Sequence, residues 1–236
     1  MTDSAGGPQT IDETRAALLD AALPHVPFDG WSRETLATAA QESGIAPTVA
    51  RAAFPRGGVD LALAFHRRGD DEMAARLAAT DLSALRFRDR IATAVRLRLD
   101  VAEPHKEAVR RGATLFALPI HAADGAAAVW ATADRIWTVL GDTSADYNWY
   151  TKRATLSGVI SSTVLYWLGD DSPRHAATWE FLDRRIENVM SFEGFKAKFL
   201  ASPVGRMMEK GPLRLLDRVR APDQSFRSQA PGWLRR

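Results

Sequence analysis

The residue types that could carry out chemistry are scattered along this chain of 236 residues and form no catalytic pattern. Its five histidines belong to no Glu-x-x-His or His-x-x-x-His pair, the spacings that place two metal ligands on one helix face. The chain has no Gly-x-Ser-x-Gly elbow and no glycine-rich phosphate loop. Zero cysteines exclude disulfides, thiolate zinc sites and cysteine nucleophiles. The sequence therefore predicts no metal, no cofactor and no enzymatic activity of its own.

Two pairs of carboxylates follow glycines, Asp70 with Asp71 and Asp170 with Asp171. Paired carboxylates can act as general acid and base. Beside a glycine, however, they more often cap helices. We therefore interpret both pairs as helix caps.

The elements that position these side chains are predicted to be all α-helical. Alanine, leucine and arginine dominate, β-branched runs are absent, and apolar residues recur at spacings of three and four. Glycine, proline and aspartate clusters divide the chain into about ten helices. They are predicted at residues 10–25, 32–42, 47–54, 60–79, 85–102, 106–118, 126–140, 146–168, 173–190 and 192–200.

Residues 30–57, GWSRETLATAAQESGIAPTVARAAFPRG, have the outline of a helix-turn-helix. Ser32 is a suitable N-cap, Leu36 and Ala40 face inward, and Gly44 lies at the turn. With the helix before it, this stretch resembles the N-terminal module of TetR-type repressors. The whole chain is therefore expected to be a TetR-like helical bundle.

The second helix of this module has few side chains that could read DNA. Base readout needs donors, acceptors or aromatics that reach into the major groove. TetR-type proteins usually carry Ser, Thr, Tyr or His there, whereas this chain has Ala46, Val49, Ala52 and Ala53. The side chains that could reach DNA are Thr48, Arg51 and Arg56. We expect no specific nucleic-acid partner, and a TetR-like DNA-binding regulator remains the alternative function.

Five of the seven tryptophans lie between residues 126 and 190. Together with aliphatic residues they form stripes on two successive helices, which face small residues such as Gly158 and Ser161. Such stripes are either a filled core or the wall of an apolar cavity, and periodicity does not distinguish the two. The candidate pocket residues are Trp130, Trp137, Leu140, Leu156, Ile160, Val164 and Trp167.

The C-terminal region is strongly basic. Residues 196–236 hold 10 Lys and Arg against 3 Asp and Glu, a net of +7, which leaves −5 for the rest of a chain whose formal charge is +2. This asymmetry indicates either contact with an anionic surface or a solvated tail. The start of the chain has no signal-peptide pattern, and no apolar run approaches the roughly 20 residues of a spanning helix. We expect a cytoplasmic protein that is peripheral on the inner face of the membrane.

Three segments carry a more specific resemblance: RDRIATAVRLRLD, GDTSADYNWYTKRATLSGV and GDDSPRHAATWEFLDRRIENVM. Over residues 10–192 the chain is similar to the family of the ninth Coq protein of coenzyme Q synthesis. The resemblance implies a TetR-like homodimer without repressor activity. It also implies a protein that binds isoprenoid quinone intermediates or phospholipid and assists a ubiquinone-biosynthesis hydroxylase, to which the catalytic metal belongs.

The resemblance further implies two contact surfaces. An aromatic and basic patch near the mouth of the candidate pocket would meet the hydroxylase, and its residues are Asp146, Asn148, Trp149, Tyr150 and Arg153. Because this patch is expected at the surface, Trp149→Ala should weaken partner binding and leave the melting temperature almost unchanged. The membrane-contacting residues are Phe192, Phe195, Lys196, Lys198 and Phe199, in which lysines flank an aromatic stripe.

The predicted organisation has five parts. They are a flexible N-terminus at 1–9, the helix-turn-helix-like module at 10–58, a lipid-binding and dimerisation bundle at 59–191, an amphipathic helix at 192–202 and a basic, disordered tail at 203–236.

Overall fold

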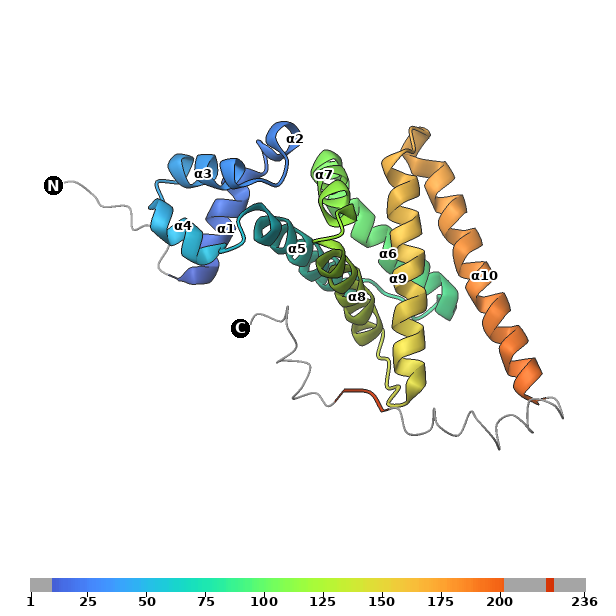
Figure 1. The fold of residues 1–236 in the computed structure, drawn as a ribbon. Coiled ribbons are helices and arrows are strands. Elements are labelled where there is room, and N and C mark those ends of the chain that lie inside the picture. The colour runs from blue at the N-terminus through green and yellow to red at the C-terminus, as the bar shows by residue number, and fades with distance from the viewer. Residues whose placement is uncertain (1–9, 202–219, 223–236) are drawn as a thin grey trace. The chain divides into compact units, whose positions relative to one another are not determined.

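The computed structural model describes residues 10–201 and 220–222, with the backbone alone for residues 190–201. Within these residues the chain forms α-helices, short 3₁₀ turns and loops, without a strand (Figure 1), so the predicted all-α class is confirmed. The helices are α1 (Ile11–Ala22), α2 (Val26–Asp29), α3 (Arg33–Glu42), α4 (Pro47–Ala53), α5 (Gly58–Ala79), α6 (Phe87–Ala102), α7 (Lys106–Ala117), α8 (Ala122–Val139), α9 (Tyr147–Leu168) and α10 (Ala176–Ala201).

Several predicted boundaries are wrong, and α8 begins at Ala122 where residue 126 was expected. The helix expected to run to residue 25 ends at Ala22, and the short α2 follows with Pro27 in its first turn, where the missing proline N–H has no helical partner to lose. The helices expected at 173–190 and 192–200 are one continuous α10. Ser191 does not interrupt a helix, and the lone Gly194 costs only about 1 kcal/mol relative to alanine.

The helices belong to two compact units. One contains Met1–Arg76 and Leu97–Ala128, and the other contains Leu77–Arg96 and Val129–Arg236. Each unit is described by itself below.

The first unit is built around the helix-turn-helix. Ser32 caps α3 by accepting a hydrogen bond from the Thr35 backbone N–H at 3.0 Å, and Leu36 and Ala40 are buried. Gly44 makes the turn with a φ of +65°, a backbone conformation that side chains other than glycine rarely adopt. The predicted roles are therefore confirmed: Ser32 is the cap, Leu36 and Ala40 face inward, and Gly44 lies at the turn.

Trp31 anchors this module to the rest of the first unit. Its indole Nε1 donates to the carbonyl of Ala108 on α7 at 2.9 Å. Its ring lies 5.4 Å from the ring of Phe65 on α5, measured between centroids. A buried indole with a satisfied N–H contributes packing area without an unpaired donor, so Trp31 ties the loop before α3 to α5 and α7.

The outward face of α4 offers little for DNA recognition. Thr48, Val49, Arg51 and Ala52 are exposed there. Arg56 donates to Asp60 at 2.8 Å and to Asp124 at 2.9 Å, and the hydrogen bond to Asp124, together with the other contacts of these two acids, raises the pKa of Arg56. A guanidinium committed to two carboxylates is a poor phosphate ligand. The absence of sequence-specific DNA binding stays a prediction, which this surface supports.

Gly58, the first residue of α5, is expected to be essential for the close approach of α5 to Trp31. A Cβ at this position would lie 2.1 Å from the carbonyl oxygen of Trp31, so Gly58→Ala forces the backbone apart. We expect the free energy of unfolding, measured by urea denaturation, to fall by about 1–3 kcal/mol. The matched control is Gly112→Ala, whose Cβ would lie 3.5 Å from Trp31 Nε1 and which should be neutral or stabilising by up to about 1 kcal/mol. Equal effects of the two changes would contradict this prediction.

Candidate functional site

The seven candidate pocket residues all lie in the second unit, on α8 and α9 or directly after α8. Trp137, Leu156, Ile160 and Trp167 are buried, and Trp167 has no exposed surface. Trp130, Leu140 and Val164 are half-buried. Most members of both predicted stripes are thus buried inside the second unit, and Trp130, Leu140 and Val164 are the more accessible ones.

Neighbouring aromatic side chains contact this interior closely. The ring of Trp137 lies 5.5 Å from that of Phe87 on α6, between centroids and tilted by 30°, and its Nε1 donates to the carbonyl of Lys152 at 3.2 Å. Trp130 lies 5.9 Å from Trp149, between ring centroids. These contacts are typical of packed core, and the role of the stripes as a lipid pocket stays a prediction.

A cavity of about 760 Å³ lies in the first unit and involves none of the seven predicted residues. Its lining includes Phe65 and Arg68 on α5 and Arg98 on α6. Arg98 is buried and donates to Asp70 at 2.7 Å, and Gly69 leaves room for it, since a Cβ there would lie 3.0 Å from the guanidinium. The charged lining suits this cavity poorly to a long apolar tail.

The prediction that Asp70 caps a helix is wrong. Asp70 lies inside α5 and pairs with Arg98 across to α6, because a buried guanidinium requires a carboxylate partner. Asp170 does act as a cap, accepting hydrogen bonds from the backbone N–H groups of Ser172 at 2.8 Å and Thr178 at 2.9 Å. The hydrogen bonds from Ser172 and Thr178 hold the pKa of Asp170 well below its usual range.

The first turn of α9 carries the residues expected to meet the hydroxylase. Asp146 is the N-cap of α9, and its carboxylate accepts the Asn148 backbone N–H at 3.0 Å and the Asn148 side-chain amide at 2.9 Å. Asp146 is exposed, and Asn148 and Tyr150 are half-buried. These three residues thus lie at the surface at the start of α9.

The expected exposure of Trp149 and Arg153 is wrong. Trp149 is 5% exposed and Arg153 is 1% exposed. The two residues are four apart and continue the stripe of Leu156 and Ile160, so they point into the unit. The guanidinium of Arg153 lies 4.0 Å from the centroid of the Trp149 ring, a cation–π contact that is strongest when water is excluded.

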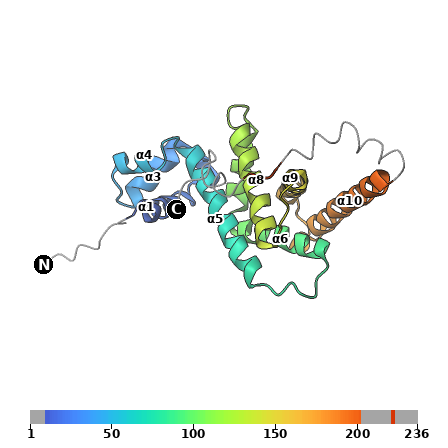
Figure 2. The same ribbon diagram turned by 90° about the horizontal axis from the view of Figure 1, so that it is seen from below.

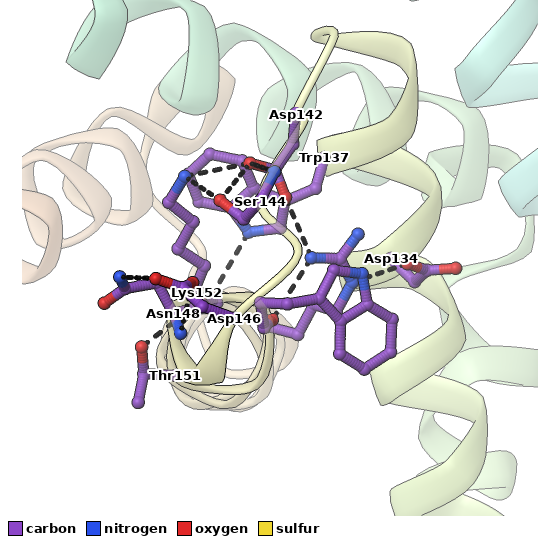
Figure 3. A network of polar contacts seen from close by, with 10 residues as sticks. Asp134, Trp137, Asp142, Ser144, Asp146, Asn148, Thr151 and Lys152 are labelled. Carbon is purple, nitrogen blue, oxygen red and sulfur yellow. Dashed lines mark hydrogen bonds and ion pairs between the residues drawn. The ribbon is translucent and has the colours of Figure 1, made fainter. Parts of the chain in front are cut away.

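Arg153 is buried because acidic side chains surround it. Its Nε donates to Asp134 of α8 at 2.5 Å, and its Nη1 donates to Asp142 at 3.0 Å and to the carbonyl of Trp149 at 3.1 Å. Lys152 donates to Asp142 at 2.8 Å and to Ser144 at 2.7 Å, as Figure 3 shows. This ion cluster, consisting of Asp134, Asp142, Ser144, Lys152 and Arg153, joins α8, the following loop and α9.

Asp142 is the centre of the ion cluster. Burial would raise the pKa of its carboxyl, but hydrogen bonds from Lys152, Ser144 and Arg153 outweigh burial and hold that pKa well below its usual range. Asp142 is therefore ionised throughout the physiological pH range. Asp134 and Asp142 were not predicted as site residues from the sequence, and the one signal for Asp134 is that it is the single acid between Trp130 and Trp137.

The predicted membrane-contacting residues Phe192, Phe195, Lys196, Lys198 and Phe199 lie outside the part of the chain whose side chains are described. Their backbone continues α10. No helix within the described ranges is long and apolar enough to cross a membrane. Those ranges also hold no group of three or more His, Asp or Glu side chains that could bind a metal ion.

The fold is that of TetR-type proteins. A crystal structure of a TetR transcriptional regulator from Nitrosomonas europaea is similar with a TM-score of 0.59 at 21% sequence identity, covering 74% of this chain and 96% of that chain. A likeness at this level of identity shows the fold alone.

The family is defined by sequence. The COQ9 family model matches residues 122–193, which include the candidate pocket and the ion cluster. The chain is 31% identical over 212 residues to ubiquinone biosynthesis protein COQ9-B of Xenopus laevis, covering 85% of this chain and 72% of that protein. It is 37% identical over 187 residues to COQ9 of Drosophila melanogaster, covering 78% of this chain and 57% of that protein. This chain therefore belongs to the COQ9 family, as its resemblance predicted.

The chain is shorter than some of these relatives. It spans 57% of the Drosophila protein and 63% of COQ9 of Homo sapiens, to which it is 30% identical over 201 residues. The names of these relatives assign them to mitochondria.

Arg153 is expected to be essential for the stability of the second unit. Arg153→Ala leaves Asp134 and Asp142 as buried carboxylates without their main partner, which should lower the free energy of unfolding by about 3–5 kcal/mol. Urea denaturation followed by circular dichroism measures the effect. The control is Arg184→Ala, which removes an exposed ion pair with Glu180 and should cost less than about 1 kcal/mol. A similar loss for both variants would show that the ion cluster does not hold α8 and α9 together.

Proposed function

We propose that this protein is a lipid-binding accessory protein of ubiquinone biosynthesis, which binds an isoprenoid quinone intermediate at the membrane and presents it to a ring hydroxylase. The observation that carries the proposal is that 37% and 31% of the aligned residues are identical to those of two proteins named for ubiquinone biosynthesis. The catalytic metal and the ring chemistry belong, in this proposal, to the hydroxylase.

The apolar interior of the second unit suits the tail of such a lipid. A polyprenyl chain gains about 0.8 kcal/mol for each CH₂ group that leaves water, so a tail of many carbons needs a shielded path out of the membrane. Trp130, Leu140 and Val164 are the half-buried members of the predicted pocket. In the proposal they form the entrance, and a rearrangement of side chains behind them admits the tail.

The proposal includes a membrane surface and a second copy of the chain as partners. The aromatic and lysine spacing from Phe192 to Phe199 favours membrane contact by the end of α10, which flotation with anionic vesicles tests. Leu165 and Tyr166 are exposed on α9 at 65% and 38%, an apolar face that a second copy would cover. Light scattering distinguishes the dimer from a monomer.

The lipid is expected to copurify with the protein. Gentle purification, solvent extraction and mass spectrometry should detect an isoprenoid quinone intermediate, and Trp130→Ala should lower its amount about tenfold, because the indole supplies a large part of the apolar contact. The control, Phe28→Ala, removes an aromatic ring that is 82% exposed in the first unit, outside the predicted pocket, and should leave the lipid unchanged. Extraction of no isoprenoid or phospholipid from well-folded wild-type protein would contradict the proposal.

Tyr150 is expected to be the anchor for the hydroxylase, because Trp149 beside it is committed to the interior. Tyr150→Ala should weaken hydroxylase binding about tenfold or more, the effect of losing an aromatic hot spot, with little change in melting temperature. Calorimetric titration with the hydroxylase of the same organism measures the affinity, and Phe28→Ala is again the control. Trp149→Ala, in contrast to the expectation from sequence, should unfold more easily by about 3–5 kcal/mol.

A further inference from the structure

A short piece of the C-terminal region lies against the start of α9. The backbone N–H of Ala221 donates to the carbonyl of Ala145 at 2.9 Å. The hydroxyl of Tyr150 donates to the carbonyl of Arg220 at 3.3 Å, a contact between residues 70 positions apart. Figures 1 and 2 show this segment in red beside the N-terminal end of α9. Residues 220–222, predicted to be part of a disordered tail, therefore have a defined place on the second unit.

The contact depends on the main chain of the segment. Arg220 contributes its carbonyl and Ala221 its N–H, while the Arg220 side chain is exposed and Ala221 and Pro222 are half-buried. Surfaces that pair with backbone groups in this way accept extended peptides, and specificity comes from the few side chains that are covered. The surface around Ala145 and Tyr150 thus has the properties of a docking site for an extended segment.

The sequence of the segment fits this mode of binding. Pro222 disfavours helical backbone at the residue before it, so Ala221 is restricted to extended conformations. In such a conformation the N–H of Ala221 has no local partner and is available to Ala145. Alanine and proline also have small, rigid side chains, which lose little conformational entropy when they are covered.

The position of the segment coincides with the surface assigned to the hydroxylase. Tyr150, the proposed anchor, uses its hydroxyl to hold Arg220, and Ala145 directly precedes the N-cap Asp146. We propose that residues 220–222 are an intramolecular occupant of the partner surface, and that an extended segment of the partner displaces them when it binds. This inference rests on the proposed function for the identity of the partner, but the docking itself does not.

The docking is tested by disulfide trapping, since the natural chain has no cysteine. Backbone groups that hydrogen-bond between adjacent extended segments place their Cα atoms about 5 Å apart, within the range of a disulfide. Full-length Ala145→Cys/Ala221→Cys, oxidised at low protein concentration, should form an intramolecular crosslink detected by peptide mass spectrometry. The control is Ala176→Cys/Ala221→Cys, because Ala176 is exposed at the start of α10 and the 22-residue α9 lies between it and Ala145. Equal crosslinking of the two variants would overturn the docking.

In the proposal, residues 220–222 mask the partner surface, that is, they cover it until the partner binds. This masking is tested by two matched changes at one position. Ala221→Pro removes the N–H that donates to Ala145, whereas Ala221→Ser keeps it. Ala221→Pro should bind the hydroxylase about tenfold more tightly, the effect expected if the surface is occupied nine-tenths of the time, and Ala221→Ser should bind like the wild type. The oxidised Ala145→Cys/Ala221→Cys protein should bind at least tenfold more weakly than after reduction.

The outcomes separate the two proposals. If every form binds the hydroxylase with one affinity, the masking is wrong and the proposed function stands. If the crosslink forms but no variant binds the hydroxylase, the partner assignment and the masking both fall while the docking stands. If the crosslink does not form and the wild type binds normally, the inference about residues 220–222 alone is wrong.

Discussion

The guanidinium of Arg153 is almost completely removed from water, and the geometry of the second unit depends on how it is neutralised. Asp134 on α8 and Asp142 in the following loop both accept hydrogen bonds from it. A buried ion pair adds little net stability over apolar packing, but it is strongly directional, and losing one partner leaves a charge with no solvent. The ion cluster therefore fixes the rotation and register of α9 against α8. Its contribution to the free energy of their packing is the smaller effect.

This fixed rotation assigns different tasks to two adjacent aromatic residues. Successive helical residues point about 100° apart, so an inward Arg153 turns Trp149 inward as well and leaves Tyr150 at the surface. Trp149 packs on the guanidinium, while the hydroxyl of Tyr150 donates to the carbonyl of Arg220. A rigid aromatic held by a buried neighbour suits recognition, because little side-chain entropy remains to be lost on binding.

Local signals in the sequence were sufficient for most of the fold and insufficient for the site. The cap at Ser32 and the turn at Gly44 follow from interactions within a few residues, and both were predicted correctly. The burial of Arg153 follows from Asp134, which is 19 residues away, and no periodicity reports such a partner. The same holds for Asp70, whose partner Arg98 is 28 residues away, and for the contact of Tyr150 with Arg220.

The fold of the helix-turn-helix in the first unit does not depend on the side chains that point outward from α4. What preserves the module is internal: the cap at Ser32, the buried Leu36, and Trp31 bonded to Ala108. DNA readout would require polar side chains on the outward face of α4, and such residues contribute nothing to the core. Alanine and valine can therefore replace them without cost to stability, and Arg56 can be committed to Asp60 and Asp124.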